Sequence, residues 1–312
     1  MLSFLKKQYI PQTEVAVTLD SLLLMQYHSA AFRFFLRKLS NSVLAGRHVS
    51  HIRGRGLDFE DSRIYVPGDD IRNLDWKISA RTGKTHTKVF NEEKDKVMLV
   101  MVDQTSGMFF GSVNKTKSVT AAEIGALLAF STLSNGDRFG GIVFNENDSY
   151  LQRPSKVKSS VTRFLQVLTD YNRSLLTIKT YSDESEKYAE NILKQIASLS
   201  SQNMLIVLIS DFRRLKNETF EYMAKLRRHN DVLLFHVYDP LEWQLPEQEV
   251  IYSNGKKQIK IKENQKQLIR KVNSRFAERR NDFFDKIAGL KITVVHINTA
   301  EPVGEQLSRW GF

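Results

Sequence analysis

The sequence predicts an α/β protein with a doubly wound, mostly parallel sheet, preceded by a helical and irregular or extended segment rich in arginine and aspartate. From residue 97 onward, short apolar runs of strand length alternate with helical patterns. This alternation is typical of a sheet with helices on both faces. The apolar runs also lack polar alternation, so we expect both faces of the strands to be covered.

The elements divide the chain into two predicted parts. Residues 1–95 hold a helix, expected over 19–46, and then a clamp segment dense in glycine, arginine and aspartate. Residues 96–312 form the sheet domain, with a buried helix closed by Asn135 and Gly136 and a short antiparallel edge strand around 149–152. The main strands are expected at 97–103, 138–144, 204–210, 232–238 and 291–297.

An insertion at about 240–288 separates the last two of these strands. It should contain a hairpin that turns at Asn254 and Gly255. A basic amphipathic helix ending at Gly289 follows. Its apolar positions are Leu268, Val272, Phe276, Phe283 and Ile287.

Composition excludes several classes of site. The chain has no cysteine, so disulfides, thiolate catalysis and cysteine-bound zinc are excluded. The longest apolar runs fall short of the roughly 20 residues that span a bilayer, and the N-terminus lacks the pattern of a signal peptide. We therefore expect a cytoplasmic protein, with peripheral contact to the inner membrane left open.

The net charge of +11 would suit nucleic acid or an anionic membrane surface. Much of the excess lies in residues 256–280, where it is expected to form the solvated face of the amphipathic helix. No nucleic-acid motif accompanies it, so nucleic acid is not the expected partner. Binding of nucleic acid or of an anionic membrane through this helix is the alternative function.

Acidic and hydroxyl side chains follow two of the predicted strands. Asp103 ends the first strand, with Thr105 and Ser106 beyond it, and Asp211 follows Ser210 at the end of another. Ligands of open α/β sheets bind beyond the carboxyl ends of the strands, and Mg²⁺ prefers oxygen ligands. These residues form a candidate magnesium site. The competing interpretation is a degenerate site whose aspartates cap strands and hold loops.

The sequence "DQTSG", with "ISDF" far downstream, resembles the metal-ion-dependent adhesion site (MIDAS) of von Willebrand A domains, which have a Rossmann-like fold. In that family an acidic side chain of the partner fills an open metal position. The resemblance assigns Asp103 and Asp211 to the two carboxylates and Thr105 to the first hydroxyl. Gly107 stands where the second serine belongs, so water or Ser106 must replace that ligand. The candidates for the loop threonine ligand are Thr177, Thr180 and Ser182.

We do not expect an enzyme. A phosphotransferase of the haloacid dehalogenase type needs a second aspartate where Thr105 stands. No Ser-His-Asp constellation is visible. His236 and His296 fall in or near strands and are expected to be core or strand-edge residues.

The segment before the sheet places opposite charges among aromatic residues. Such density suggests bidentate, partly desolvated ion pairs that fix an irregular chain against the sheet domain. An anion or partner site is the alternative interpretation. The residues concerned are Arg55, Asp58, Arg63, Tyr65, Asp69, Asp70, Arg72, Asp75, Trp76 and Arg81.

This segment resembles the signature of the domain of unknown function 58 family, in which it precedes a von Willebrand A-like sheet. The pattern is met by Phe59, Arg63, Tyr65, Gly68, Asp69, Asp70, Arg72, Asp75, Trp76, Ser79, Ala80 and Arg81. Downstream, "YDPLEWQLPE" is similar to a second element of the family. Its positions are Asp239, Pro240, Glu242, Leu245 and Pro246.

The resemblance implies a non-enzymatic bacterial protein-interaction module. Family members are typically encoded beside a MoxR-type AAA+ ATPase and other von Willebrand A proteins, and are thought to help the ATPase mature or assemble client complexes. These proteins are the implied partners, and the strand-end site is the implied docking site. Mg²⁺ is the one implied cofactor. Many members also carry two membrane helices before this region, which this chain is expected to lack.

Overall fold

The computed structural model describes residues 15–29, 57–92, 96–177, 185–199, 203–213, 217–246, 250–253, 258–261 and 266–311. Its contacts divide the chain into two compact units. The sheet unit comprises Met1–Val43 and Lys96–Phe312, and the hairpin unit comprises Leu44–Asp95. Residues 1–95 were expected to form one part of the chain, and the described residues 15–29 belong to the sheet unit.

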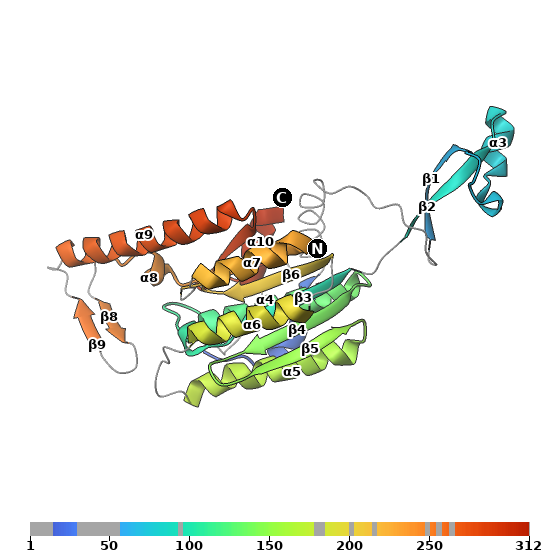
Figure 1. The fold of residues 1–312 in the computed structure, drawn as a ribbon. Coiled ribbons are helices and arrows are strands. Elements are labelled where there is room, and N and C mark those ends of the chain that lie inside the picture. The colour runs from blue at the N-terminus through green and yellow to red at the C-terminus, as the bar shows by residue number, and fades with distance from the viewer. Residues whose placement is uncertain are drawn as a thin grey trace, which may run out of the picture. The chain divides into compact units, whose positions relative to one another are not determined.

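The sheet unit is built on a central sheet that has six strands among the described residues, in the order β10-β7-β6-β3-β4-β5 (Figure 1). All neighbours are parallel except β4 and β5, which are antiparallel. The predicted mostly parallel sheet with an antiparallel edge strand is confirmed. The strands are β3 (Val97–Asp103), β4 (Arg138–Phe144), β5 (Ser149–Ser155), β6 (Met204–Ser210), β7 (Asp231–Tyr238) and β10 (Thr293–Asn298).

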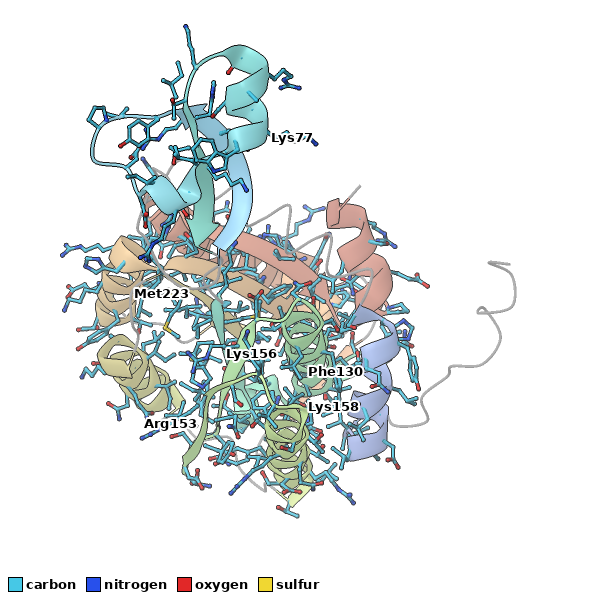
Figure 2. All side chains as sticks on the ribbon, turned by 90° about the vertical axis from the view of Figure 1, so that its right-hand side faces the viewer. Lys77, Phe130, Arg153, Lys156, Lys158 and Met223 are labelled. Carbon is cyan, nitrogen blue, oxygen red and sulfur yellow. The ribbon has the colours of Figure 1, made fainter. Side chains whose placement is uncertain are left out.

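Helices cover both faces of this sheet (Figure 1), as the continuous apolar strands predicted. Side chains of α1 (Leu19–Leu24), α4 (Lys117–Ser134), α5 (Lys158–Ser174) and α10 (Val303–Gly311) share one core cluster with the strands. Those of α6 (Ser185–Leu199), α7 (Asn217–His229) and the end of α9 (Lys266–Gly289) share the other. Phe130 and Met223 mark the two clusters in Figure 2.

Helix α4 lies at the centre of its layer, and nearly all of its residues are buried. The Thr116 side chain caps its first turn by accepting the N–H of Val119 at 3.3 Å. The helix ends at Ser134 with Asn135 as its C-cap, and Gly136 follows with a φ of +78°, in the left-handed region that glycine favours.

Short elements at the N-terminus and in the loops complete the sheet unit. Leu22 of α1 and Met25 of η2 (Met25–Tyr27) lie in the core beside α4. The rest of the helix expected over residues 19–46 lies outside the described residues. The other short helices are η4 (Ser106–Met108), η5 (Leu175–Thr177) and α8 (Pro240–Trp243).

The insertion has the predicted order of elements. Strands β8 (Val250–Ser253) and β9 (Gln258–Ile261) form an antiparallel hairpin. The turn expected at Asn254 and Gly255 lies outside the described residues. Helix α9 follows and ends at Gly289, as predicted. None of the helices in the described ranges combines the length and apolar character needed to cross a bilayer.

The hairpin unit is more regular than the predicted clamp segment. Strands β1 (Leu57–Ile64) and β2 (His86–Glu92) pair antiparallel, and η3 (Ile71–Asn73) and α3 (Trp76–Thr82) lie between them in the sequence. Asp75 caps α3 by accepting the N–H groups of Lys77 at 3.1 Å and Ile78 at 3.0 Å. The Ser62 hydroxyl donates to the other oxygen of Asp75 at 3.0 Å, which joins β1 to the helix.

Candidate functional site

The candidate site lies at the carboxyl edge of the sheet, where the parallel strands end. Strands β3 and β6 are neighbours there, and the chain continues from β3 to β4 on one side and from β6 to β7 on the other. The order therefore reverses between β3 and β6, which is the topological switch point where open α/β sheets bind ligands. Asp103 ends β3, and Asp211 directly follows β6.

Asp103 is a buried carboxyl group held by two hydrogen bonds. Its Oδ2 accepts the Ser210 hydroxyl at 2.6 Å, and its Oδ1 accepts the N–H of Thr105 at 2.9 Å. Burial, together with the nearby charge of Asp211, raises the pKa of Asp103 to about 6. The hydrogen bonds from Ser210 and Thr105 oppose this rise in part. Both oxygens of Asp103 thus already have donors within the chain.

Lys117 is one of the residues of this edge that were not identified from the sequence. It is the first residue of α4 and its side chain is fully buried. Its Nζ lies 2.5 Å from Asp211 Oδ2 and 2.8 Å from Glu242 Oε1. Burial by itself would lower the pKa of the ammonium, but the carboxylates of Asp211 and Glu242 outweigh burial and raise it. Lys117 is therefore a charged ammonium inside the protein.

Arg213 completes the group that we call the ion cluster, which comprises Lys117, Asp211, Arg213 and Glu242. The guanidinium of Arg213 contacts Glu242 Oε1, and its backbone N–H donates to Asp211 Oδ1 at 3.1 Å. Burial raises the pKa of Asp211, but the charges of Lys117 and Arg213 outweigh burial and lower it. Arg213 is 48% exposed and connects the buried cluster to the surface.

Asp239 fixes helix α8, which carries Glu242 into the cluster. Its carboxylate accepts the backbone N–H of Ser112 at 2.7 Å and the Ser112 hydroxyl at 2.6 Å. It also accepts the Thr299 hydroxyl at 2.6 Å and the N–H of Leu241 at 2.9 Å. Asp239 thus holds α8 against the β3–α4 loop and the residue after β10, and Glu242 of the same helix binds Lys117 and Arg213.

The remaining predicted ligands bond elsewhere. The Ser106 hydroxyl donates to Glu146 Oε1 at 2.5 Å, and its N–H donates to the same oxygen at 2.6 Å. The Thr177 hydroxyl donates to the backbone oxygen of Ser174 at 2.8 Å. Thr180 and Ser182 lie outside the described residues.

The donor set at this edge does not match that of a hydrated magnesium ion, which prefers an octahedron of oxygen atoms. Both oxygens of Asp103 accept hydrogen bonds, one oxygen of Asp211 is paired with Lys117, and Gly107 has no side-chain oxygen. Among the described residues, no group of three or more His, Cys, Asp or Glu is placed to hold a metal ion. The carboxylate oxygens of Asp211 and Glu242 bind the ammonium of Lys117 instead.

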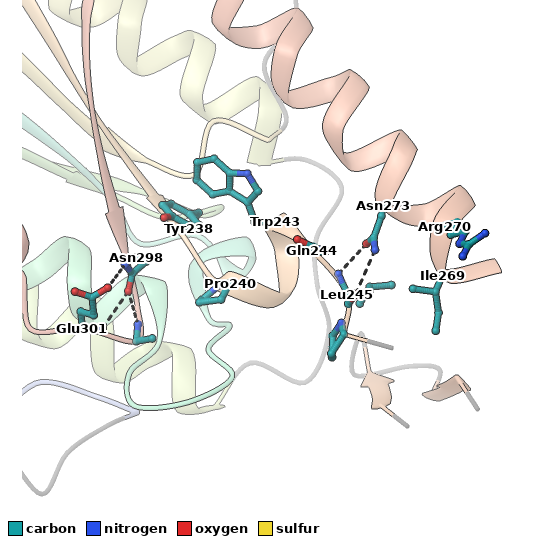
Figure 3. Close-up of a pocket in the computed structure, with 12 residues that line it drawn as sticks. Tyr238, Pro240, Trp243, Gln244, Leu245, Ile269, Arg270, Asn273, Asn298 and Glu301 are labelled. Atoms are coloured by element: carbon teal, nitrogen blue, oxygen red, sulfur yellow. Dashed lines mark hydrogen bonds between the residues drawn. The ribbon is translucent and has the colours of Figure 1, made fainter. Parts of the chain in front are cut away.

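A pocket of about 790 Å³ lies at the carboxyl ends of β7 and β10 (Figure 3). Helix α8 links it to the ion cluster, because Glu242 belongs to the cluster and the adjacent Trp243 lines the pocket. The Asn273 side chain holds one wall in place by accepting the N–H of Leu245 at 2.7 Å and donating to its carbonyl at 3.2 Å. The walls combine aromatic, aliphatic and charged groups, including Tyr238, Trp243, Leu245, Ile269, Arg270 and Glu301.

Two histidines lie in an aromatic cluster next to this pocket. The Nδ1 atoms of His236 and His296 lie 3.2 Å apart, and both rings contact Trp243 and Phe284. Burial, reinforced by the charge of His296, lowers the pKa of His236 to about 3. His236 is therefore neutral at physiological pH and packs as an aromatic ring.

In the hairpin unit, the acidic signature residues mainly cap backbone groups. Asp70 accepts the N–H of Arg72 at 3.0 Å, and Asp75 caps α3. Asp69 accepts the N–H of Val66 at 3.1 Å and pairs with Arg63 at 2.7 Å. This differs from the expected set of desolvated arginine–aspartate pairs, because turns and helix starts leave N–H groups that a nearby carboxylate satisfies.

The other signature residues are more exposed than expected. Trp76 is 71% exposed, Arg72 and Arg81 are also exposed, and Tyr65 is half-buried. The backbone of Asp58 and Phe59 belongs to β1, and their side chains, like the whole of Arg55, lie outside the part of the chain that the structure describes. The surface of the hairpin unit therefore carries two arginines and a tryptophan of the signature.

Comparison with known proteins identifies a family and several relatives. The family model for "Protein of unknown function DUF58" matches residues 61–285. The uncharacterized proteins Rv1480 of Mycobacterium tuberculosis (strain H37Rv) and Mb1516 of Mycobacterium bovis are each 28% identical over 210 residues, which cover 66% of this chain and 63% of the relative. The alignment thus spans less than two thirds of the length of these relatives.

Two solved structures match part of this chain. The conserved hypothetical protein BatB from Bacteroides thetaiotaomicron is 14% identical with a TM-score of 0.43, over 69% of this chain and 96% of its own. The VWA domain of SpRpn10 is 12% identical with a TM-score of 0.39, over 69% of this chain and 94% of its own. Both scores are low, so the fold assignment rests on the observed strand order and the family match.

Proposed function

The chain belongs to the DUF58 family of proteins of unknown function, and on that premise we propose that it is a non-catalytic protein-interaction module that docks a partner at the carboxyl edge of its von Willebrand A-like sheet. The state of the charged groups at this edge supports the proposal. Asp103, Asp211 and Glu242 each hold a hydroxyl, an amide or a cation of the chain itself. A general base or nucleophile would instead need access to a reacting group.

The surface beside these groups suits a protein partner. The pocket presents Tyr238 and Trp243, whose ring centroids lie 3.8 Å apart, and aromatic residues are enriched in the centres of protein interfaces. Val113 in the β3–α4 loop is 64% exposed, and Arg213 of the ion cluster offers a half-exposed cation. The carboxyl edge therefore combines aromatic anchors, an exposed apolar group and a surface charge.

For the partner itself we propose a MoxR-type AAA+ ATPase or a client complex of that ATPase, with other von Willebrand A proteins as further members of the assembly. This part of the proposal rests on the family resemblance. It places the protein in a chaperone-like role in the cytoplasm, including the cytoplasmic surface of the membrane. It requires no cofactor.

A pull-down with the MoxR-type ATPase of the same organism tests the docking face. Arg270 lines the pocket and is exposed on α9, so Arg270→Glu reverses a charge at the proposed interface without removing core packing. Arg153 is the matched control, because it is an exposed arginine that does not line the pocket. It lies on the edge strand β5, next to Gln152, which pairs with Gly141 of β4 (Figure 2). We expect binding about tenfold weaker for Arg270→Glu, as for a central interface residue, and unchanged binding for Arg153→Glu.

Two results would count against this proposal in different ways. Failure of the wild-type protein to retain the ATPase, with and without nucleotide, would remove the proposed partner. Equal retention by the wild type and both variants would remove the pocket as the docking face but leave the partner in place.

A second candidate function is suggested by the exposed cations of α9. Lys271, Arg275 and Arg279 recur at a spacing of four residues and form one stripe along the helix. Such a stripe suits a polyanion, either a nucleic acid or an anionic membrane surface. Binding through it should fall steeply with salt as counterions are released. Titration of DNA, RNA and anionic vesicles at low salt would remove this candidate if none of them binds.

A further inference from the structure

We propose that the Lys117 ammonium permanently takes the place of a divalent cation at the carboxyl edge, so that this edge is built to work without metal. The inference concerns the edge itself and does not depend on the partner proposed above. Lys117 Nζ lies 2.5 Å from Asp211 and 2.8 Å from Glu242, two carboxylates that reach it from different segments.

Charge balance supports this substitution. The carboxylates of Asp211 and Glu242 are matched by the cations of Lys117 and Arg213, so the ion cluster is neutral. A magnesium ion bound to Asp211 Oδ2 would lie within roughly 5 Å of Lys117 Nζ, given a metal–oxygen distance of about 2.1 Å. At that distance the like charges would repel strongly, because the surroundings are buried and screen poorly.

The position of Lys117 in α4 also needs an explanation. A cation in the first turn of a helix opposes the helix dipole, and complete burial removes its hydration. Both unfavourable terms are offset only because the two carboxylates converge on this point. The ammonium in turn joins the start of α4, the residue after β6 and helix α8, which a bound cation would also have to join.

An ordinary buried salt bridge would give the same geometry, so the test must separate the two interpretations. Removing Lys117 would destabilise the protein in either case, because Asp211 and Glu242 would lose the buried cation that they share. Only if the ammonium fills a cation position should a divalent ion restore what the variant has lost. The response of the variant to metal is therefore the decisive measurement.

The experiment compares thermal unfolding of the full chain in EDTA and in MgCl₂ or MnCl₂ at constant ionic strength. The test variants are Lys117→Ala and Lys117→Met, of which the second keeps most of the buried stem. The matched control is Lys115→Ala, because Lys115 lies two residues earlier and pairs at 2.5 Å with a single carboxylate, that of Glu123. The double variant Lys117→Ala/Asp211→Asn removes one of the carboxylates that would hold the ion.

We expect the melting temperatures of the wild type and of Lys115→Ala to be the same in EDTA and in Mg²⁺. Those of Lys117→Ala and Lys117→Met should be lower in EDTA and rise with Mg²⁺ or Mn²⁺ by at least about 2–4 °C, the shift that tight binding gives a chain of this size. The double variant should lose this response.

Stabilisation of the wild type by either metal would overturn the inference. So would a folded Lys117 variant that neither metal stabilises. Should both Lys117 variants fail to fold, Mn²⁺ titration of the wild type followed by water proton relaxation still decides. Absence of binding at millimolar Mn²⁺ supports the inference, and binding at the ion cluster that Asp211→Asn abolishes contradicts it.

Discussion

Asp103 carries a buried carboxyl group whose ionisation its surroundings oppose. The pKa is raised from 3.8 to about 6, first by burial and then by the charge of Asp211. Between these values the unfolded chain ionises at Asp103 while the folded protein keeps the proton. Folding stability from this group is therefore complete below pH 3.8 and is lost as pH rises through about 6.

The variant Asp103→Asn should remove this pH dependence. The amide oxygen can accept the Thr105 N–H, and the amide nitrogen can donate to the Ser210 hydroxyl. We expect the free energy of unfolding of the Asp103→Asn variant, relative to wild type, to rise by up to about 3 kcal/mol between pH 4 and pH 7.5. Urea unfolding of both proteins at the two pH values measures this difference. A difference that is constant with pH would show that Asp103 titrates normally.

His236 gives the opposite pH dependence. Burial and the neighbouring His296 lower the pKa of His236 from 6.5 to about 3, so the unfolded chain takes up a proton that the folded protein excludes. Stability from this group is complete above pH 6.5 and is lost as pH falls toward 3. The wild type should therefore lose about 2 kcal/mol through His236 between pH 6.5 and pH 5.

The variant His236→Asn tests this, because an asparagine amide can stand near the position of Nδ1 that contacts His296. We expect it to be less stable than wild type at pH 7 but to lose less stability on acidification. His229→Asn is the control, since His229 is exposed at the end of α7. Unfolding titrations at pH 5, 6 and 7.5 compare the slopes. Equal slopes for wild type and His236→Asn would contradict the buried neutral state.

At the scale of residues, the sequence revealed the carboxylates but not the cation between them. Asp103 and Asp211 could be placed because each directly follows an apolar run of strand length. Lys117 is the first residue of an apolar helix, where a lysine is normally a solvated residue of the first turn. Its burial results from the meeting of the start of α4 with the end of β6 and with α8. Asp211 and Glu242, which bind Lys117 there, are 94 and 125 residues away from it in the sequence. No local sequence pattern predicts a contact between residues so far apart in the chain.

At the scale of elements, the contact between β4 and α5 depends on a glycine. A Cβ added to Gly141 would lie 2.3 Å from a ring carbon of Phe164. The Phe164 ring is fully buried there and packs edge-on against Phe139 with centroids 5.1 Å apart. The helix can therefore lie close to the sheet only because position 141 has no side chain.

Substitution of this glycine should separate the two layers. We expect Gly141→Ala to lower the free energy of unfolding by about 1–3 kcal/mol, the usual effect of overpacking. Gly304→Ala in α10 is the control, because an added Cβ meets no atom within 4 Å. The double variant Gly141→Ala/Phe164→Leu should be more stable than the sum of the two single changes predicts. Strict additivity in urea unfolding would contradict the proposed clash.

The elements that the sequence predicted best are those with one dominant pattern. Strands β3, β4 and β6 have the predicted bounds because each consists mainly of apolar residues and has polar residues at one or both ends, which mark where the strand starts or stops. The hairpin of β1 and β2 was predicted only as an irregular or extended chain. Strand β1 reads "LDFEDSRI", in which charged residues interrupt the apolar pattern. Its regularity comes from backbone pairing with β2 and from the cap by Asp75, neither of which is visible in a single stretch.

At the scale of the whole molecule, the chain consists of two compact units with separate internal contacts. The sheet unit has two apolar core clusters, one on each face of the sheet. The hairpin unit has the β1–β2 pairing and the Asp75 bonds to Lys77, Ile78 and Ser62. The sequence indicated a boundary near residue 95 from the change in composition. It could not indicate that the first helix groups with the sheet, because that depends on the burial of Leu22 and Met25 against α4 and α5.

This division predicts that loss of one helix cap affects one unit. Asp75→Ala removes the cap of α3 in the hairpin unit, and Thr116→Ala removes the cap of α4 in the sheet unit. Each loss should weaken its own unit by about 1 kcal/mol, enough to accelerate amide exchange several-fold. Hydrogen exchange followed by mass spectrometry should show faster exchange in 76–92 for Asp75→Ala and in 117–134 for Thr116→Ala. If Asp75→Ala accelerated exchange in β3 and β6 as much as in α3, the two units would be one cooperative body.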